Sequence, residues 1–156
     1  MAGTVREYRE KVQQLENTVI SIAGECILEN SEQIAQLLVY QQREQSEDSA
    51  GQSLRPYSRR YALEKQHLTG RGDVTDLDLT GEFHADMTVR VDGEMYEIES
   101  TSTTSDGELK SAWLNRWNQA KGGAEVMTLT PENKQQVWAI IRDDFMEKVG
   151  EVLVFD

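Results

Sequence analysis

The side chains best suited to chemistry are acids on a predicted β-hairpin. Two alternating runs, Phe83–Val91 and Glu94–Thr101, flank the dipeptide Asp92-Gly93. Asp-Gly between such runs is a strong hairpin signal, because both residues tolerate the positive φ of a type I′ turn. One face of this hairpin is apolar and suits a core, while the other face is polar and meets water or a partner. The predicted register pairs Val91 with Glu94, Val89 with Tyr96, Met87 with Ile98, and Asp86 with Glu99.

The polar face of this hairpin is the best candidate for a chemical site. Asp86 is expected opposite Glu99, with Glu97 and His84 beside them. Facing carboxylates repel each other, so a compensating charge is needed. The candidates are a divalent cation, Arg90 reaching across the ladder, and a basic surface on another subunit. A metal-dependent, nuclease-like enzyme is one hypothesis, but an acid stands where a restriction-type nuclease would want a lysine.

Other catalytic signatures are missing from the sequence. It has only two histidines, and it contains no G-x-S-x-G elbow, no phosphate-binding glycine loop and no H-E-x-x-H motif. The single cysteine, Cys26, excludes an internal disulfide and a multi-cysteine metal site, and it suits a buried, inert thiol. The sequence therefore predicts a protein that is not an enzyme and needs no metal and no cofactor.

Charge is abundant and unevenly distributed. The net charge of −12 disfavours an autonomous nucleic-acid binder, which must neutralise phosphates. Acids dominate residues 72–110, whereas Arg55, Arg59, Arg60 and Lys65 form a basic stretch before them. A basic patch on one copy and an acidic face on the next would fix the register of a ring. A solvated helix face and contact with nucleic acid in a pore are the alternatives.

A long amphipathic helix is predicted for residues 5–44. Val12, Val19 and Ile22 follow heptad steps, and the apolar stripe continues beyond them. One interpretation is a single helix that projects and packs against neighbouring copies. The other is a pair of shorter core helices joined near Asn30-Ser31, where Ser31 would cap the second.

The remaining chain is expected to form a small α+β domain. Residues 45–53 contain no apolar side chain larger than Ala and are typical of a linker or loop. After the hairpin, Ser105 and Glu108 have capping-box spacing and open a helix that carries Trp113 and Trp117. The pair Thr130-Pro131 opens the next helix.

These elements define an α+β fold with three parts. They are a long N-terminal helix at 1–44, a linker at 45–53, and an α+β domain at 54–156. In that domain a central antiparallel hairpin sheet has the C-terminal helices packed on one face. The apolar stretch 152–155 is expected to be a final strand or a segment that docks on a neighbour. With no signal peptide and no membrane-length apolar run, synthesis in a cytoplasm and no membrane contact are expected.

Three short segments resemble the neck proteins of tailed bacteriophages, the small head–tail joining or tail-completion proteins. Asp76–Met87 resembles the strand and Leu-Thr-Gly turn that lead into their hairpin. Leu129–Lys134 is similar to the start of their C-terminal helix, and Leu54–Ser58 to their basic stretch. The chain departs from the pattern in its acidic hairpin and at residues 122–126.

This resemblance implies a structural subunit of a phage neck, forming a homo-oligomeric ring between portal and tail without catalysis. Such a protein is made in the host cytoplasm and ends in the virion. It touches portal or adaptor and tail proteins and lies near DNA in the channel. The alternative is a small dimeric adaptor or regulatory protein that associates through its N-terminal helix. Residues expected at subunit contacts are Arg55, Arg59, Arg60, Lys65, Asp86, Glu97, Glu99, Val12, Val19 and Ile22.

Overall fold

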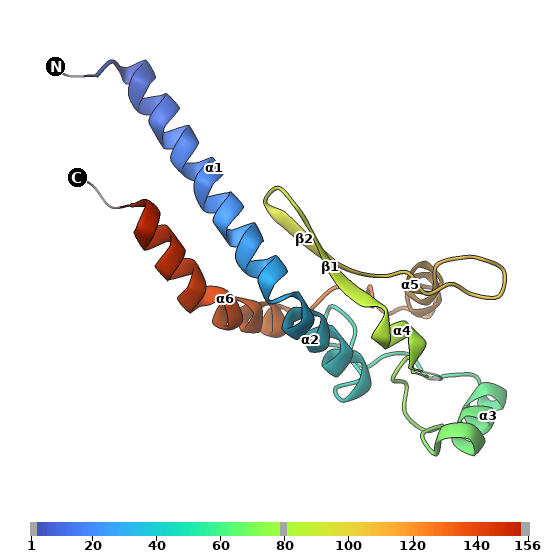
Figure 1. The fold of residues 1–156 in the computed structure, drawn as a ribbon. Helices are drawn as coiled ribbons and strands as arrows, with labels where there is room; N and C mark the ends of the chain where they lie inside the picture. Colours follow the sequence, from blue (N-terminus) through green and yellow to red (C-terminus); the bar gives the residue numbers. More distant parts are fainter. Residues whose placement is uncertain (1–2, 79–80, 154–156) are drawn as a thin grey trace.

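The computed structural model describes residues 3–78 and 81–153, which form an elongated α+β molecule (Figure 1). This confirms the predicted fold class, with a long N-terminal helix, an antiparallel hairpin and helices after it. The elements are α1 (Val5–Glu29), α2 (Ser31–Arg43), α3 (Arg59–Thr69), α4 (Glu82–Ala85), β1 (Met87–Asp92), β2 (Met95–Ser100), α5 (Lys110–Ala120) and α6 (Pro131–Val152).

Helices α1 and α2 meet at Asn30, so the predicted helix over residues 5–44 is interrupted. A capping box between Thr4 and Glu7 begins α1. At the other end, the Asn30 side-chain amide donates to the Cys26 carbonyl at 2.8 Å and satisfies one of the last carbonyls of the helix. The N-terminal part of α1 projects away from the other elements (Figure 1), whereas its C-terminal part and α2 pack into the core.

The hydrophobic core lies where α2 meets α6, the hairpin and the segment before α6. Ile34 and Leu38 of α2 are fully buried, as is Val126. Fully burying side chains of this size contributes roughly 1.5–3 kcal/mol each. The core also contains Ile22, Cys26, Ala35, Val39, Leu54, Leu77, Phe83, Met87, Ile98, Leu129, Val137 and Ile141.

The hairpin forms with a register different from the predicted one. Val91 pairs with Tyr96 and Asp92 with Met95, so the loop is Gly93-Glu94. Gly93 occupies the first loop position at φ +58°, as in a type II′ turn. Each residue of β1 therefore pairs with the β2 residue that lies two positions after its predicted partner. Because side chains alternate with period two, a shift of two leaves the apolar and polar faces unchanged.

The first predicted strand begins four residues too early. Phe83 belongs to α4, a single helical turn that follows Gly81 at φ +82°, and Asp86 is the C-cap of that turn. Asp86 therefore does not face Glu99, whose ladder partner is Thr88.

The loop at residues 45–53 is tied to the folded body. Glu47 and Ser53 form an isolated β-bridge, and Asp48 is fully buried. At the other end of the chain, Val152 is the last residue of α6, and the predicted tail element from residue 154 onward lies outside the described residues. Among residues 3–78 and 81–153, no helix combines the length and apolar character that crossing a bilayer requires.

Candidate functional site

The predicted acidic site on the hairpin is partly neutralised within the subunit, by one arginine that faces two acids. Arg90 Nη2 lies 2.7 Å from Glu97 Oε2, and Arg90 Nε lies 3.7 Å from Glu99 Oε2. Of the three compensating charges that the sequence suggests, the structure thus contains the arginine. Asp86 lies apart from these two acids and accepts a 2.7 Å hydrogen bond from the Ser102 hydroxyl. Within the described ranges, no three His, Cys, Asp or Glu side chains cluster in a way that could hold a metal ion.

The basic stretch divides into surface and interior residues. Arg59 and Arg60 are exposed, whereas Arg55 is half-buried and its Nη2 donates to the Gly122 carbonyl at 3.0 Å. Lys65 has 0% of its side chain exposed and forms an ion pair with Asp76. Lys65 therefore does not belong to a surface patch. Its charge is paired in the interior instead.

The heptad residues of α1 pass from solvent into the core along one stripe. Val12 is 56% exposed, Val19 is half-buried, and Ile22 is only 8% exposed. Helix α6 runs beside the C-terminal half of α1 (Figure 1), where Lys148 Nζ bonds to Glu29 at 2.8 Å. We call the exposed part of this stripe the α1 seam, which consists of Val5, Tyr8, Val12 and Leu15.

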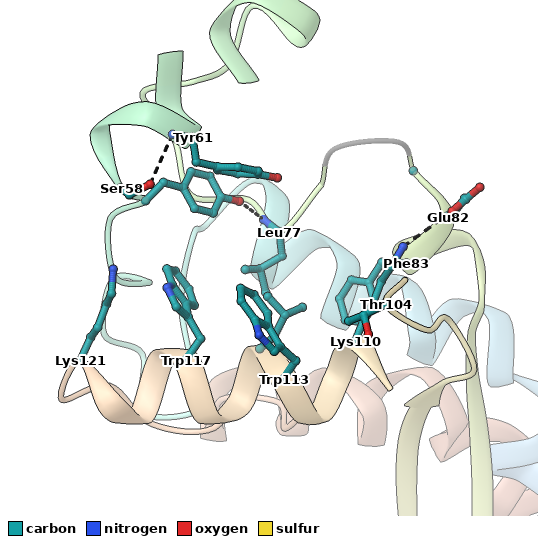
Figure 2. Close-up of a pocket in the computed structure, with 13 residues that line it drawn as sticks. Ser58, Tyr61, Leu77, Glu82, Phe83, Thr104, Lys110, Trp113, Trp117 and Lys121 are labelled. Carbon is teal, nitrogen blue, oxygen red and sulfur yellow. Dashed lines mark hydrogen bonds and ion pairs between the residues drawn. The ribbon is translucent and has the colours of Figure 1, made fainter. Parts of the chain in front are cut away.

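An aromatic cleft of about 590 Å³ lies between α3, α4 and α5 (Figure 2). One face of α5 provides its floor. Lys110, Trp113 and Trp117 stand at helical spacing, followed by Lys121 at the C-cap. The indole rings of Trp113 and Trp117 are nearly parallel, at 6° and 6.4 Å between centroids. Two tryptophans thus lie between two lysines.

The opposite wall of the aromatic cleft is built around Tyr57. Its ring stacks on Trp117 at 5.9 Å and meets Tyr61 edge-on at 4.8 Å. The Tyr57 hydroxyl accepts a 3.0 Å hydrogen bond from the Leu77 amide. Burial is the main cause that raises the pKa of Tyr57 well above its usual range, so the hydroxyl stays protonated.

The wall also contains one strained residue. Leu77 has φ +58°, a left-handed backbone conformation that is rare for a branched side chain. The Tyr57 hydroxyl holds its amide, and its side chain is buried at the base of the cleft. Such strain persists only where surrounding structure fixes it, and it is common at binding sites. In the wall, the hydrogen bond to Tyr57 and the burial of the side chain hold Leu77 in this conformation.

A lysine stands at each end of the cleft, and the one at the α4 end is paired with an acid. Lys121 Nζ lies 5.0 Å above the Trp117 ring and donates to the Pro56 carbonyl at 3.2 Å. Lys110 Nζ lies 3.7 Å from Glu82, a largely exposed acid at the other end. An apolar ligand with an acidic group at the Lys121 end, and a second acid that replaces Glu82 at the Lys110 end, would match this arrangement.

Sequence reasoning noted the two tryptophans as neighbours but missed the cleft. The signal was the α5 face itself, because positions 110, 113, 117 and 121 follow helical spacing. The wall could not be inferred, since Tyr57 and Leu77 come from separate loops. With this geometry in view, comparison with known proteins gives no match to a protein family, a curated protein or a solved structure.

His84 lies in the interior and not on the polar hairpin face predicted for it. It belongs to α4, is 6% exposed, and its Nε2 lies 2.9 Å from Gln42 Oε1. The Gln42 amide nitrogen donates to the Val126 carbonyl, so its oxygen faces the histidine and Nε2 carries the proton. The other ring nitrogen, Nδ1, has no hydrogen-bond partner in the described part of the chain.

We predict that His84 makes stability depend on pH below neutrality. Burial lowers the pKa of His84 to about 4. The unfolded chain, with a pKa near 6.5, then binds the proton more readily than the folded chain. Stability from the neutral ring is complete above about pH 6.5 and is lost progressively toward pH 4, by about 3 kcal/mol in total.

The measurement is urea unfolding from pH 7.5 to 4.5, comparing the wild-type chain with His84→Gln. Carboxylates titrate in both proteins, so their contribution to the free energy of unfolding cancels in the difference between the two curves. The exposed histidine provides the control variant, His67→Gln, whose curve should parallel the wild type. Parallel curves for His84→Gln and the wild type would contradict the prediction.

Proposed function

We propose that the chain is a structural subunit of a phage neck that assembles with copies of itself between portal and tail. The observation that carries the proposal is the α1 seam. Val5 is 75% exposed and Tyr8 63%, although their heptad spacing is that of a packed helix face. A large exposed apolar stripe on a projecting helix is typical of an interaction surface. The resemblance of three short segments to neck proteins supports the class.

A ring requires two different surfaces on each copy, because its contacts are heterologous. The α1 seam and the aromatic cleft supply two such surfaces, and they lie toward opposite ends of the molecule (Figure 1). Their separation supports head-to-tail assembly. The pairing of Arg59 and Arg60 with hairpin acids of a neighbour remains part of this proposal.

A second candidate is a dimeric adaptor that associates through α1. The spacing of Val5, Tyr8, Val12 and Leu15 alternates three and four residues, which is the a/d pattern of a coiled coil. A two-stranded coiled coil would bury this stripe symmetrically. The candidates differ in stoichiometry, so mass distinguishes them.

We predict that light scattering over a range of concentrations will show an oligomer larger than a dimer. Val12→Asp should shift it to smaller species, because the charge would be buried without a partner. Gln14→Asp adds the same charge beside the seam and should leave the mass unchanged. The salt dependence of the mass separates two kinds of contact. An oligomer held by the apolar α1 seam should keep its mass at high salt, whereas one held by arginine–acid pairs should dissociate.

A dimer that Val12→Asp dissociates would favour the adaptor. A monomer at every concentration that also fails to bind a purified portal ring would contradict the proposed neck function.

A further inference from the structure

We propose that the aromatic cleft binds residues 151–156 of a second copy of this chain. The inference deepens the proposed function, since it names the contact that would join neighbouring copies. The segment reads Glu-Val-Leu-Val-Phe-Asp, with four apolar residues between two acids. The floor of the cleft carries two tryptophans between two lysines. The order of charged and apolar positions is therefore complementary, and at Lys110 an acid of the segment would take the place of Glu82, which lies 3.7 Å away.

The lengths also match. From Lys110 to Lys121 the helical rise is about 16 Å, at about 1.5 Å per residue. From Glu151 to Asp156 an extended backbone spans about 16 Å, at about 3.3 Å per residue. An extended segment can therefore place one acid near each lysine while its apolar side chains lie over the indole rings.

The described beginning of this segment is available for binding. Val152 is 50% exposed at the end of α6, and Leu153 is 36% exposed after it. Gly150 stands immediately before the segment, and glycine is a weak helix former. The last turn of α6 can thus unwind at that point to present an extended strand.

The binding partner must be another copy. The C-terminal end of α6 lies beside α1, away from the end of the molecule where α3 and α5 enclose the cleft (Figure 1). Binding of residues 151–156 of one copy in the cleft of the next is a head-to-tail contact. Such contacts close into a ring when the rotation between copies allows it.

The direct test is fluorescence anisotropy with a labelled peptide of residues 150–156. The protein is the full chain carrying Phe155→Asp, whose own tail should no longer compete for the cleft. We expect saturable binding that Trp113→Ala weakens at least about tenfold, as for an aromatic hot spot. Trp138→Ala removes an equally exposed tryptophan on α6 and should not change the affinity.

Two further variants guard against a folding artefact. Lys121→Glu changes an exposed residue at the cleft and should also weaken the peptide, whereas a peptide with Leu153 and Phe155 replaced by Ser should not bind. No binding of the tail peptide, or equal binding to Trp113→Ala, overturns the inference. Tighter binding of a proline-rich peptide would also overturn it, by assigning the cleft to a different protein.

The oligomer provides a second and separable readout. Phe155→Asp and Trp113→Ala should each lower the mass, and their mixture should form pairs through the one intact tail and the one intact cleft. An oligomer that both variants leave intact overturns the inference while self-assembly stands. A monomeric wild type that still binds the peptide at Trp113 supports the contact and counts against the ring.

Discussion

Replacing Asp76 with Asn should destabilise the fold by about 3–5 kcal/mol, because it leaves a buried lysine without its counter-charge. Lys65 Nζ and Asp76 Oδ1 form a salt bridge in which the side chains are 0% and 2% exposed. Asp76 also accepts the Asp78 amide at 3.1 Å and lies 3.3 Å from Arg71 Nε. One carboxylate therefore contacts two cations.

Removing the lysine instead of the aspartate should destabilise the fold less. In Lys65→Met the carboxylate keeps Arg71 as a partner, and the methionine fills most of the space of the lysine stem. We expect a loss of about 1–2 kcal/mol, near the cost of a lost charge-assisted hydrogen bond. The double variant should then be more stable than the sum of the two single losses predicts, since no unpaired lysine remains.

Urea unfolding of the wild type, both single variants and the double variant measures this coupling. Glu64→Gln is the control, because it removes one charge from the exposed surface of the same helix. Equal costs for the two single variants, or strict additivity, would show that the pair does not act as a unit.

At the hairpin, the sequence predicts some features of the fold and not others. Its place and its two faces follow from alternation, which is insensitive to a register shift of two. The position of the turn does not follow from alternation. Gly93 suits the second loop position of a type I′ turn as well as the first loop position of a type II′ turn. The run Phe83–Asp86 alternates as a strand does, but Gly81 at φ +82° starts a helical turn there.

The buried charges show why part of the candidate surface was misjudged. A lysine in a charged helix is usually solvated, and nothing local to Lys65 reveals its partner eleven residues later. The aromatic cleft has the same difficulty, since Tyr57 and Trp117 stack across sixty residues of chain. Periodicity predicts the α5 face, but only the tertiary fold brings a wall to it.

Removing the Asp48 carboxylate should cost about 3 kcal/mol or more, because several donors would lose a buried charged acceptor at once. Asp48 is fully buried in the loop between α2 and α3. Its Oδ1 accepts the amides of Ala50 at 3.0 Å and Gln52 at 3.1 Å. Its Oδ2 accepts the Ala124 amide at 2.9 Å and the Asn118 side-chain amide at 3.4 Å.

We expect Asp48→Asn to be nearly as harmful as Asp48→Ala. The asparagine keeps one oxygen for the loop amides, but it turns an NH2 group toward the Ala124 amide, where two donors would face each other. Asp106→Ala, at an exposed loop position, is the control and should change stability by less than about 0.5 kcal/mol.

The effect should reach the aromatic cleft, because the same carboxylate positions α5. Asn118 lies one residue after Trp117, and its Oδ1 accepts the Arg55 amide at 3.1 Å, close to the Tyr57 wall. Asp48 thus fastens the floor of the cleft to its wall through Asn118. At a temperature where Asp48→Asn is still folded by circular dichroism, the labelled tail peptide should bind it more weakly than Asp106→Ala. Unchanged affinity in a destabilised Asp48→Asn would show that the cleft holds its shape independently of this carboxylate.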